Sequence, residues 1–196
     1  MHRVFETFHS PKKLKEKNMK TQKNPTLVYT RPDSGYVLPL IQAAMIAAIY
    51  VVLTFIANAF GLANYAIQVR FSEALTILPY FTPTAIPGLV IGCFLSNILT
   101  GCALPDIVFG TFATFVGAVL TYKLRRFKWL APVPPVAANA VIVPFVLLYA
   151  YGIRPLWLSF ITVTVGEIIS CGLLGMILLF ALEKYRGRLF TPRISS

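Results

Sequence analysis

The sequence predicts an all-α integral membrane protein, built as a bundle of six transmembrane helices. First, 57% of its 196 residues are hydrophobic and only 13% are charged, whereas soluble domains carry roughly 25% charged residues. Second, apolar runs of about 20 residues, the length that crosses a bilayer, recur along the chain. Third, basic residues gather beside these runs, as they do in the cytoplasmic loops of membrane proteins.

The net charge of +11 would suit nucleic-acid binding, but the positions of the charges indicate a different role. Eight of the 18 Lys and Arg residues lie in residues 1–31, four lie in the loop 123–128, and four lie in residues 184–193 at the C-terminal end. We therefore place all three segments in the cytoplasm, where they can contact anionic lipid head groups. Nothing in the pattern requires a nucleic acid.

These clusters divide the chain into a basic lead (1–36), a membrane domain (37–184) and a basic tail (185–196). The lead has no apolar core of signal-peptide length, so we expect it to be disordered, with Met19 as an alternative start. The predicted location is the cell membrane, crossed several times, with both termini in the cytoplasm.

The first predicted span covers residues 38–58, which at ~1.5 Å per residue reach across a hydrocarbon core of ~30 Å. It contains two overlapping pairs of small residues spaced four apart, Ala43 with Ala47 and Ala44 with Ala48. Such pairs let another helix approach closely in a membrane. Alanine is also common in membrane helices, but two adjacent pairs favour a helix-docking face.

The stretch 68–97, QVRFSEALTILPYFTPTAIPGLVIGCFLSN, combines ionisable residues with an interrupted apolar run. Gln68, Arg70 and Glu73 precede the run, and three prolines at positions 79, 83 and 87 then break it every four residues. Proline removes a backbone donor from a helix, and in lipid the freed groups persist only where protein or a water-filled cavity satisfies them. The pattern therefore predicts a binding site rather than a plain anchor.

Later spans are predicted at 106–122, 130–151 and 156–183. The lead and the loop 123–128 are both basic, so we expect both on the cytoplasmic side. A single crossing by the segment 74–100 would place them on opposite sides. We therefore expect this segment to cross twice, with a short first pass and a break around Pro83 and Pro87.

This topology gathers the polar residues of the spans and outer loops in the outer half of the bundle. A buried charge such as Glu167 costs a few kcal/mol, so membrane carboxylates are functional by default. Glu167 is expected either to contact a ligand, or to pair with Arg70 or Arg154, or to be protonated. Asn97 and Asn139 suit either interhelical hydrogen bonds or recognition of a heterocycle.

Two further acidic residues near the outer face have a structural alternative as well. Glu73 follows Arg70 by three residues, so on a helix the two would share a face and could form a salt bridge at the interface. Asp106 follows Pro105 and opens a predicted span, where a helix N-cap is the simpler interpretation.

The sequence shows no sign of an enzyme, a metal site or a cofactor. Both histidines, His2 and His9, lie in the lead, and the chain has neither a P-loop nor a Gly-x-Ser-x-Gly motif. Its three cysteines have no metal-ligand spacing and are expected to pack as small apolar residues. If the chain transports a solute, the energy must come from a partner or an ion gradient.

The run QVRFSEALTILPYFTPTAIPGLVIGCFLSN, together with KWLAP and VGEIISCGLLG, resembles the QueT family over roughly residues 37–184. These proteins are substrate-binding S components of energy-coupling factor (ECF) transporters, associated with uptake of a queuosine precursor. The resemblance implies a six-helix fold of the S-component type and a substrate site near the extracellular face. It also implies docking on a transmembrane coupling subunit that carries two ATPase subunits, through alanines such as Ala43, Ala44, Ala47 and Ala48.

The implied substrate is a 7-deazaguanine such as preQ1, with a guanine-like edge and a cationic aminomethyl group. A carboxylate can accept two hydrogen bonds from a guanine edge, so Glu73 or Glu167 would bind the edge and the other would face the ammonium. Asn97 and Asn139 would complete the edge, and Arg70 and Gln68 would border the site. The alternatives are an S component for another vitamin or heterocycle, a stand-alone secondary transporter, and a membrane protein without a ligand.

Overall fold

The computed structural model describes residues 34–61 and 69–186, and the described helices from Gly35 onward belong to one compact unit. The predicted lead (1–36) and tail (185–196) fall mostly outside these residues, as does Gln68. Every regular element in the described part of the chain is helical. The chain is therefore an all-helical membrane protein, as its composition predicts.

Four of the helices are long and apolar enough to cross a membrane: Tyr36–Ala59, Leu104–Lys123, Lys128–Tyr151 and Leu156–Glu183. They correspond to α1 (Ser34–Ala59), α3 (Leu104–Lys123), α4 (Val133–Tyr151) with the turn η2 (Lys128–Leu130) before it, and the last helix. The last helix runs without a break through α5 (Leu156–Glu167), the π-helical segment η3 (Ile168–Leu174) and α6 (Gly175–Glu183). These four elements match the predicted spans to within a few residues.

The proline-rich segment forms two separate helices, which confirms the predicted break. The 3₁₀ helix η1 (Phe71–Tyr80) ends before Pro83, and α2 (Ala85–Leu99) begins after it. Pro79 lies inside η1, and Pro87 lies in the first turn of α2, where a missing N–H costs little. At ~2.0 Å per residue η1 is about 20 Å long, and α2 at ~1.5 Å per residue is about 22 Å long. Both are shorter than a full bilayer core, so the two crossings remain a prediction.

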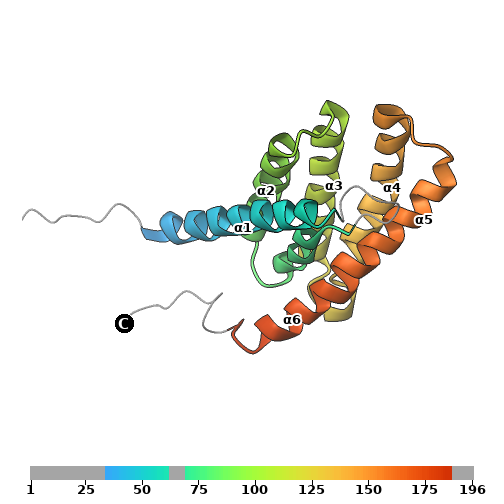
Figure 1. Cartoon of the computed structure of the whole chain (residues 1–196). Helices are drawn as coiled ribbons and strands as arrows, with labels where there is room; N and C mark the ends of the chain where they lie inside the picture. Colours follow the sequence, from blue (N-terminus) through green and yellow to red (C-terminus); the bar gives the residue numbers. More distant parts are fainter. Residues whose placement is uncertain (1–33, 62–68, 187–196) are drawn as a thin grey trace, which may run out of the picture. The chain divides into compact units, whose positions relative to one another are not determined.

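Figure 1 shows α2, α3 and α4 following one another in chain order, and each packs against the next. The helix α1 packs against α2, where two glycines allow close approach: a Cβ on Gly88 would lie 2.7 Å from the carbonyl oxygen of Ala43. The last helix packs against α4 through α5 and against η1 through η3 and α6. As a result η1, which lies in the stretch 68–97, is enclosed by several helices.

The enclosure of η1 explains its composition. Nine of its ten residues are buried, and Ile77 and Leu78 join a core cluster with Tyr50, Leu89 and Leu179. Gly175 lets the last helix approach, since a Cβ there would lie 3.1 Å from Ile77 Cγ2. The segment is thus held on all sides and can present its polar residues at fixed positions.

Candidate functional site

A polar cavity of about 260 Å³ lies at the ends of α1, α2, α3 and α4, beside the beginning of η1. Ligand pockets span roughly 300–1,000 Å³, so this cavity suits a small ligand. Its walls combine residues from α1, from both ends of the stretch 68–97 and from later parts of the chain: Thr54, Ala57, Asn58, Arg70, Asn97, Thr100, Cys102, Asp106, Leu147, Tyr151 and Ile153.

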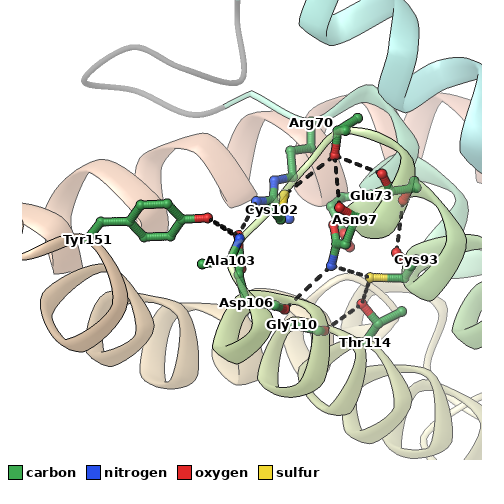
Figure 2. Close-up of polar contacts among 12 residues, drawn as sticks. Arg70, Glu73, Cys93, Asn97, Cys102, Ala103, Asp106, Gly110, Thr114 and Tyr151 are labelled. Carbon is green, nitrogen blue, oxygen red and sulfur yellow. Dashed lines mark hydrogen bonds and ion pairs between the residues drawn. The ribbon is translucent and has the colours of Figure 1, made fainter.

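Side chains from α3, from α4 and from the residue before η1 meet at one carboxylate in the wall of this cavity. Arg70 Nη2 lies 4.0 Å from Asp106 Oδ2, and the hydroxyl of Tyr151 lies 3.3 Å from the same oxygen and 3.0 Å from the backbone nitrogen of Ala103 (Figure 2). Burial opposes the charge of Arg70, but the carboxylate of Asp106 keeps the pKa of this guanidinium above its ordinary value. The second oxygen, Asp106 Oδ1, is buried and has no hydrogen-bond partner among the described residues.

Asn97 lies on the α2 side of the cavity, next to the beginning of α3. Its Nδ2 atom is 3.5 Å from the backbone oxygen of Asp106 and 3.7 Å from Cys93 Sγ (Figure 2). A Cβ on Gly110 would lie 3.3 Å from this nitrogen, so the glycine allows α3 to approach the amide. The contact with the backbone oxygen is long for an N–H···O hydrogen bond, and sulfur is a weak acceptor, which leaves the Asn97 amide able to form a better hydrogen bond.

A second polar cluster lies next to the cavity and is built around two buried carboxylates. Glu73 on η1 is 2% exposed, and Glu167 at the end of α5 is 6% exposed. One oxygen of each and Cys171 Sγ all lie within 4.8 Å of one another. Arg70 connects the two groups of residues, because its side chain lines the cavity while its backbone nitrogen donates to Ser170 Oγ at 3.1 Å.

The π-helical segment η3 brings the last helix into contact with η1. Cys171 Sγ lies 3.2 Å from Glu167 Oε2 and 3.3 Å from the backbone oxygen of Glu73. Thr76 Oγ1 is also 3.3 Å from this sulfur. Short π-helical segments occur often at functional sites, and here the segment places Ser170 and Cys171 against η1.

The two carboxylates have different neighbours. The hydroxyl of Tyr50, on α1, donates a hydrogen bond to Glu73 Oε1, whereas Glu73 Oε2 is buried without a hydrogen-bond partner among the described residues. The side chain of Asn139, on α4, interacts with both Glu73 and Glu167. Four helical elements therefore contribute to one small polar cluster.

Three buried carboxyl groups lie in this region, those of Glu73, Asp106 and Glu167. Among the described residues, only that of Asp106 forms an ion pair here, with Arg70. A buried carboxylate oxygen that lacks a donor costs free energy, and two of the three carboxylates have such an oxygen. The arrangement suits a small ligand with several N–H donors and a positive charge. By ligand type Glu73, Glu167 and Cys171 would also fit a metal ion.

The structure brings together five of the six predicted substrate-binding residues, and the sixth, Gln68, lies outside the described residues. Arg70 and Asn97 line the cavity, whereas Glu73, Asn139 and Glu167 form the buried cluster beside it. The possible salt bridge between Arg70 and Glu73 is not formed, because Arg70 precedes η1 and pairs with Asp106 instead.

The N-cap interpretation of Asp106 is wrong. The helix α3 begins two residues earlier, at Leu104, and its N-cap is Ala103. Asp106 lies in the first turn and turns its carboxylate towards Arg70 and Tyr151. Sequence reasoning also did not assign Tyr50 or Cys171 to the site, since neither residue type stands out in an apolar helix.

The structure divides the four alanines of α1 into two pairs. Ala43 and Ala47 are buried, and both lie against the glycines of α2. Ala44 and Ala48 are exposed on the surface of the described part of the chain. Helix packing within the chain therefore accounts for the first pair, and only the second is available to another protein.

Comparisons with known proteins agree with the resemblance in the sequence. The sequence model of the QueT transporter family matches residues 40–184, which is more than half of the chain. This range includes the residues of the cavity and of the buried cluster beside it. The Queuosine precursor transporter QueT of Lactococcus lactis subsp. cremoris is 33% identical over 90 residues, which make up 45% of this chain. These residues cover 53% of that protein, so the match spans about half of its length. No solved structure matches the chain.

Proposed function

The chain belongs to the QueT transporter family, and from this premise we propose that it is the substrate-binding S component of an ATP-driven ECF importer. It captures a queuosine precursor, a 7-deazaguanine such as preQ1, from outside the cell. The relative from Lactococcus lactis carries the name of a queuosine precursor transporter, and the family is one of transporters rather than enzymes.

The observation that carries this proposal is a pair of buried carboxylate oxygens, Glu73 Oε2 and Asp106 Oδ1, beside a cavity of about 260 Å³. Neither oxygen has a donor among the residues that the structure describes. The edge of a 7-deazaguanine offers adjacent N–H groups that a carboxylate can accept together. Its aminomethyl group adds a cation, which would pair with one of the buried carboxylates. A neutral apolar ligand would leave both oxygens unsatisfied.

The proposed ligand occupies the cavity and reaches the neighbouring cluster. Glu73 or Glu167 accepts the hydrogen bonds of the base edge, and the other carboxylate faces the ammonium. Two amides complete the polar contacts. Asn139 interacts with both carboxylates, and Asn97 has only a long contact with a backbone oxygen and a contact with sulfur. Arg70 pairs with Asp106, and Gln68 is proposed to border the entrance.

As an S component the chain would form six transmembrane segments, with η1 and α2 as the two short passes and both termini in the cytoplasm. It would receive its energy from a transmembrane coupling subunit and two ATPase subunits. The exposed pair Ala44 and Ala48 is the proposed contact for that coupling subunit, because small residues allow close approach of a second helix.

Binding to the purified protein tests the proposal directly. We expect preQ1 to bind and to raise the melting temperature of the chain in detergent, as ligands of a native state do. Glu73→Gln and Glu167→Gln should each weaken binding by about tenfold to a hundredfold, the range of a hydrogen bond to a charged group. Glu183→Gln is the matched control, because Glu183 lies at the far end of α6 in a partly exposed pair with Lys128.

Two results would overturn different parts of the proposal. Stabilisation by another vitamin or heterocycle, with no effect of preQ1 or preQ0, would refute the substrate. Wild-type binding of preQ1 by the double variant Glu73→Gln/Glu167→Gln would refute the site. Uptake of preQ1 by the chain in cells that lack any coupling subunit would refute the S-component role.

A further inference from the structure

The hydroxyl of Tyr50 has an unusual position for a residue of the apolar core. Tyr50 is 1% exposed and packs in the cluster that contains Ile77, Leu89 and Leu179. A phenylalanine would fill almost the same volume without placing a polar atom there. The hydroxyl donates a hydrogen bond to the carboxylate of Glu73 and also interacts with the side chain of Cys93. The carboxylate is the stronger acceptor of the two, so the role of the hydroxyl is sought there.

The same helix makes a second polar contact with η1 one turn further on. The hydroxyl of Thr54 lies 2.9 Å from Ser72 Oγ and 2.9 Å from the backbone oxygen of Tyr50, and Thr54 lines the cavity. Tyr50 and Thr54 thus hold two consecutive residues of η1, Ser72 and Glu73. The carboxylate of Glu73 is fixed through Oε1, while Oε2 has no hydrogen-bond partner within residues 34–61 and 69–186.

From this geometry we propose that Tyr50 is a positioning residue of the substrate site. Its hydroxyl orients the carboxylate of Glu73 so that Oε2 accepts a donor of the ligand. The inference rests on the proposed function, because it assumes that Glu73 binds the substrate. It gives α1, which lines the cavity through Thr54, Ala57 and Asn58, a role in orienting a binding group, although no residue of the first span was predicted to bind the substrate.

A double-mutant cycle separates positioning from simple packing. We expect Tyr50→Phe to weaken preQ1 binding about tenfold, the lower end of the effect of a hydrogen bond to a charged group. In the Glu73→Gln background the same substitution should have little further effect, because the carboxylate that it orients is already gone. Tyr80→Phe is the matched control, because Tyr80 is a buried tyrosine of the same core cluster and should leave the affinity unchanged.

The outcomes are distinguishable. If the wild-type chain does not bind preQ1, the proposed function fails. If the wild type binds, but the losses from Tyr50→Phe and Glu73→Gln simply add, the positioning role is refuted. The melting temperature of each ligand-free variant is measured alongside. A large fall for Tyr50→Phe with an unchanged affinity would show that the hydroxyl serves stability alone and would equally refute the role.

Discussion

The crossing of α1 and α2 allows a quantitative prediction, because a glycine leaves no room there for even one methyl group. A Cβ on Gly92 would lie 2.7 Å from Tyr50 Cβ and 3.1 Å from both Cα and the carbonyl oxygen of Ala47. Ordinary van der Waals contact begins at 3.4 Å, so Gly92→Ala forces the two helices apart by several tenths of an ångström. The opposing atoms of Tyr50 and Ala47 belong to the backbone or are bonded directly to it, so no side-chain rotation can move them away.

Two effects of opposite sign decide the magnitude. Overpacking of a closely packed interface costs about 1–3 kcal/mol, whereas alanine improves the helix propensity by about 1 kcal/mol relative to glycine. We therefore expect a net loss of about 1 kcal/mol or somewhat more. For a chain of this size about 1 kcal/mol lowers the melting temperature by about 2–4 °C. Because α1 carries Tyr50, the shift should also weaken ligand binding.

The natural cysteines provide the assay. Cys93 and Cys171 are buried, so a thiol-reactive fluorescent dye reports their exposure as the protein unfolds in detergent. Gly172→Ala is the matched control, since a Cβ there would meet only Ile168 Cγ2 at an ordinary 3.6 Å, and its melting temperature should not fall. If Gly92→Ala melts at or above the wild-type temperature, the close approach of α1 and α2 does not hold.

Three further predictions concern α1 and the cavity. Ala48→Leu, at an exposed position, should keep the fold and ligand binding but abolish co-purification with a coupling subunit. Ala47→Leu, at a buried position, should instead lower the melting temperature. Equal effects of the two variants on the melting temperature would contradict the division of the alanines into a buried and an exposed pair. Cys102 lines the cavity and is partly exposed, so bound preQ1 should slow its alkylation several-fold, as mass spectrometry of the labelled protein would show; an unchanged rate would place the ligand elsewhere. Asp106→Asn removes the carboxylate that faces Arg70 and should weaken preQ1 binding about tenfold, as measured by calorimetry. The surface change Glu183→Gln should leave the affinity unchanged. Equal affinities of the two variants for preQ1 would exclude Asp106 from the site.

The positions of the long helices follow from the sequence because hydrophobicity is a local property. A continuous apolar run of sufficient length satisfies its own backbone hydrogen bonds as a helix and needs no knowledge of its neighbours. The predicted spans 38–58, 106–122 and 156–183 accordingly differ from the helices by no more than four residues at either end. The break around Pro83 was predictable for the same reason, since proline lacks the backbone donor that a helix requires.

The composition of the site was also partly visible in the sequence. Buried carboxylates and amides are costly in a membrane, so Glu73, Asn97, Asn139 and Glu167 stand out against their apolar surroundings wherever they fold. Family resemblance then connected these residues with a heterocyclic ligand. Neither argument required knowing which helices contact one another.

Only the tertiary structure decided which of these groups meet, because partners far apart in the chain are set by packing and not by local pattern. It paired Arg70 with Asp106, 36 positions away, instead of with nearby Glu73, and it placed Tyr50 on the carboxylate of Glu73. It also turned Ala43 and Ala47 inward and left Ala44 and Ala48 exposed, a choice that depends on where Gly88 and Gly92 lie on the neighbouring helix. Hydrophobicity thus determines which segments enter the membrane, whereas the close contacts of glycine, tyrosine and carboxylate side chains determine what the assembled bundle can bind.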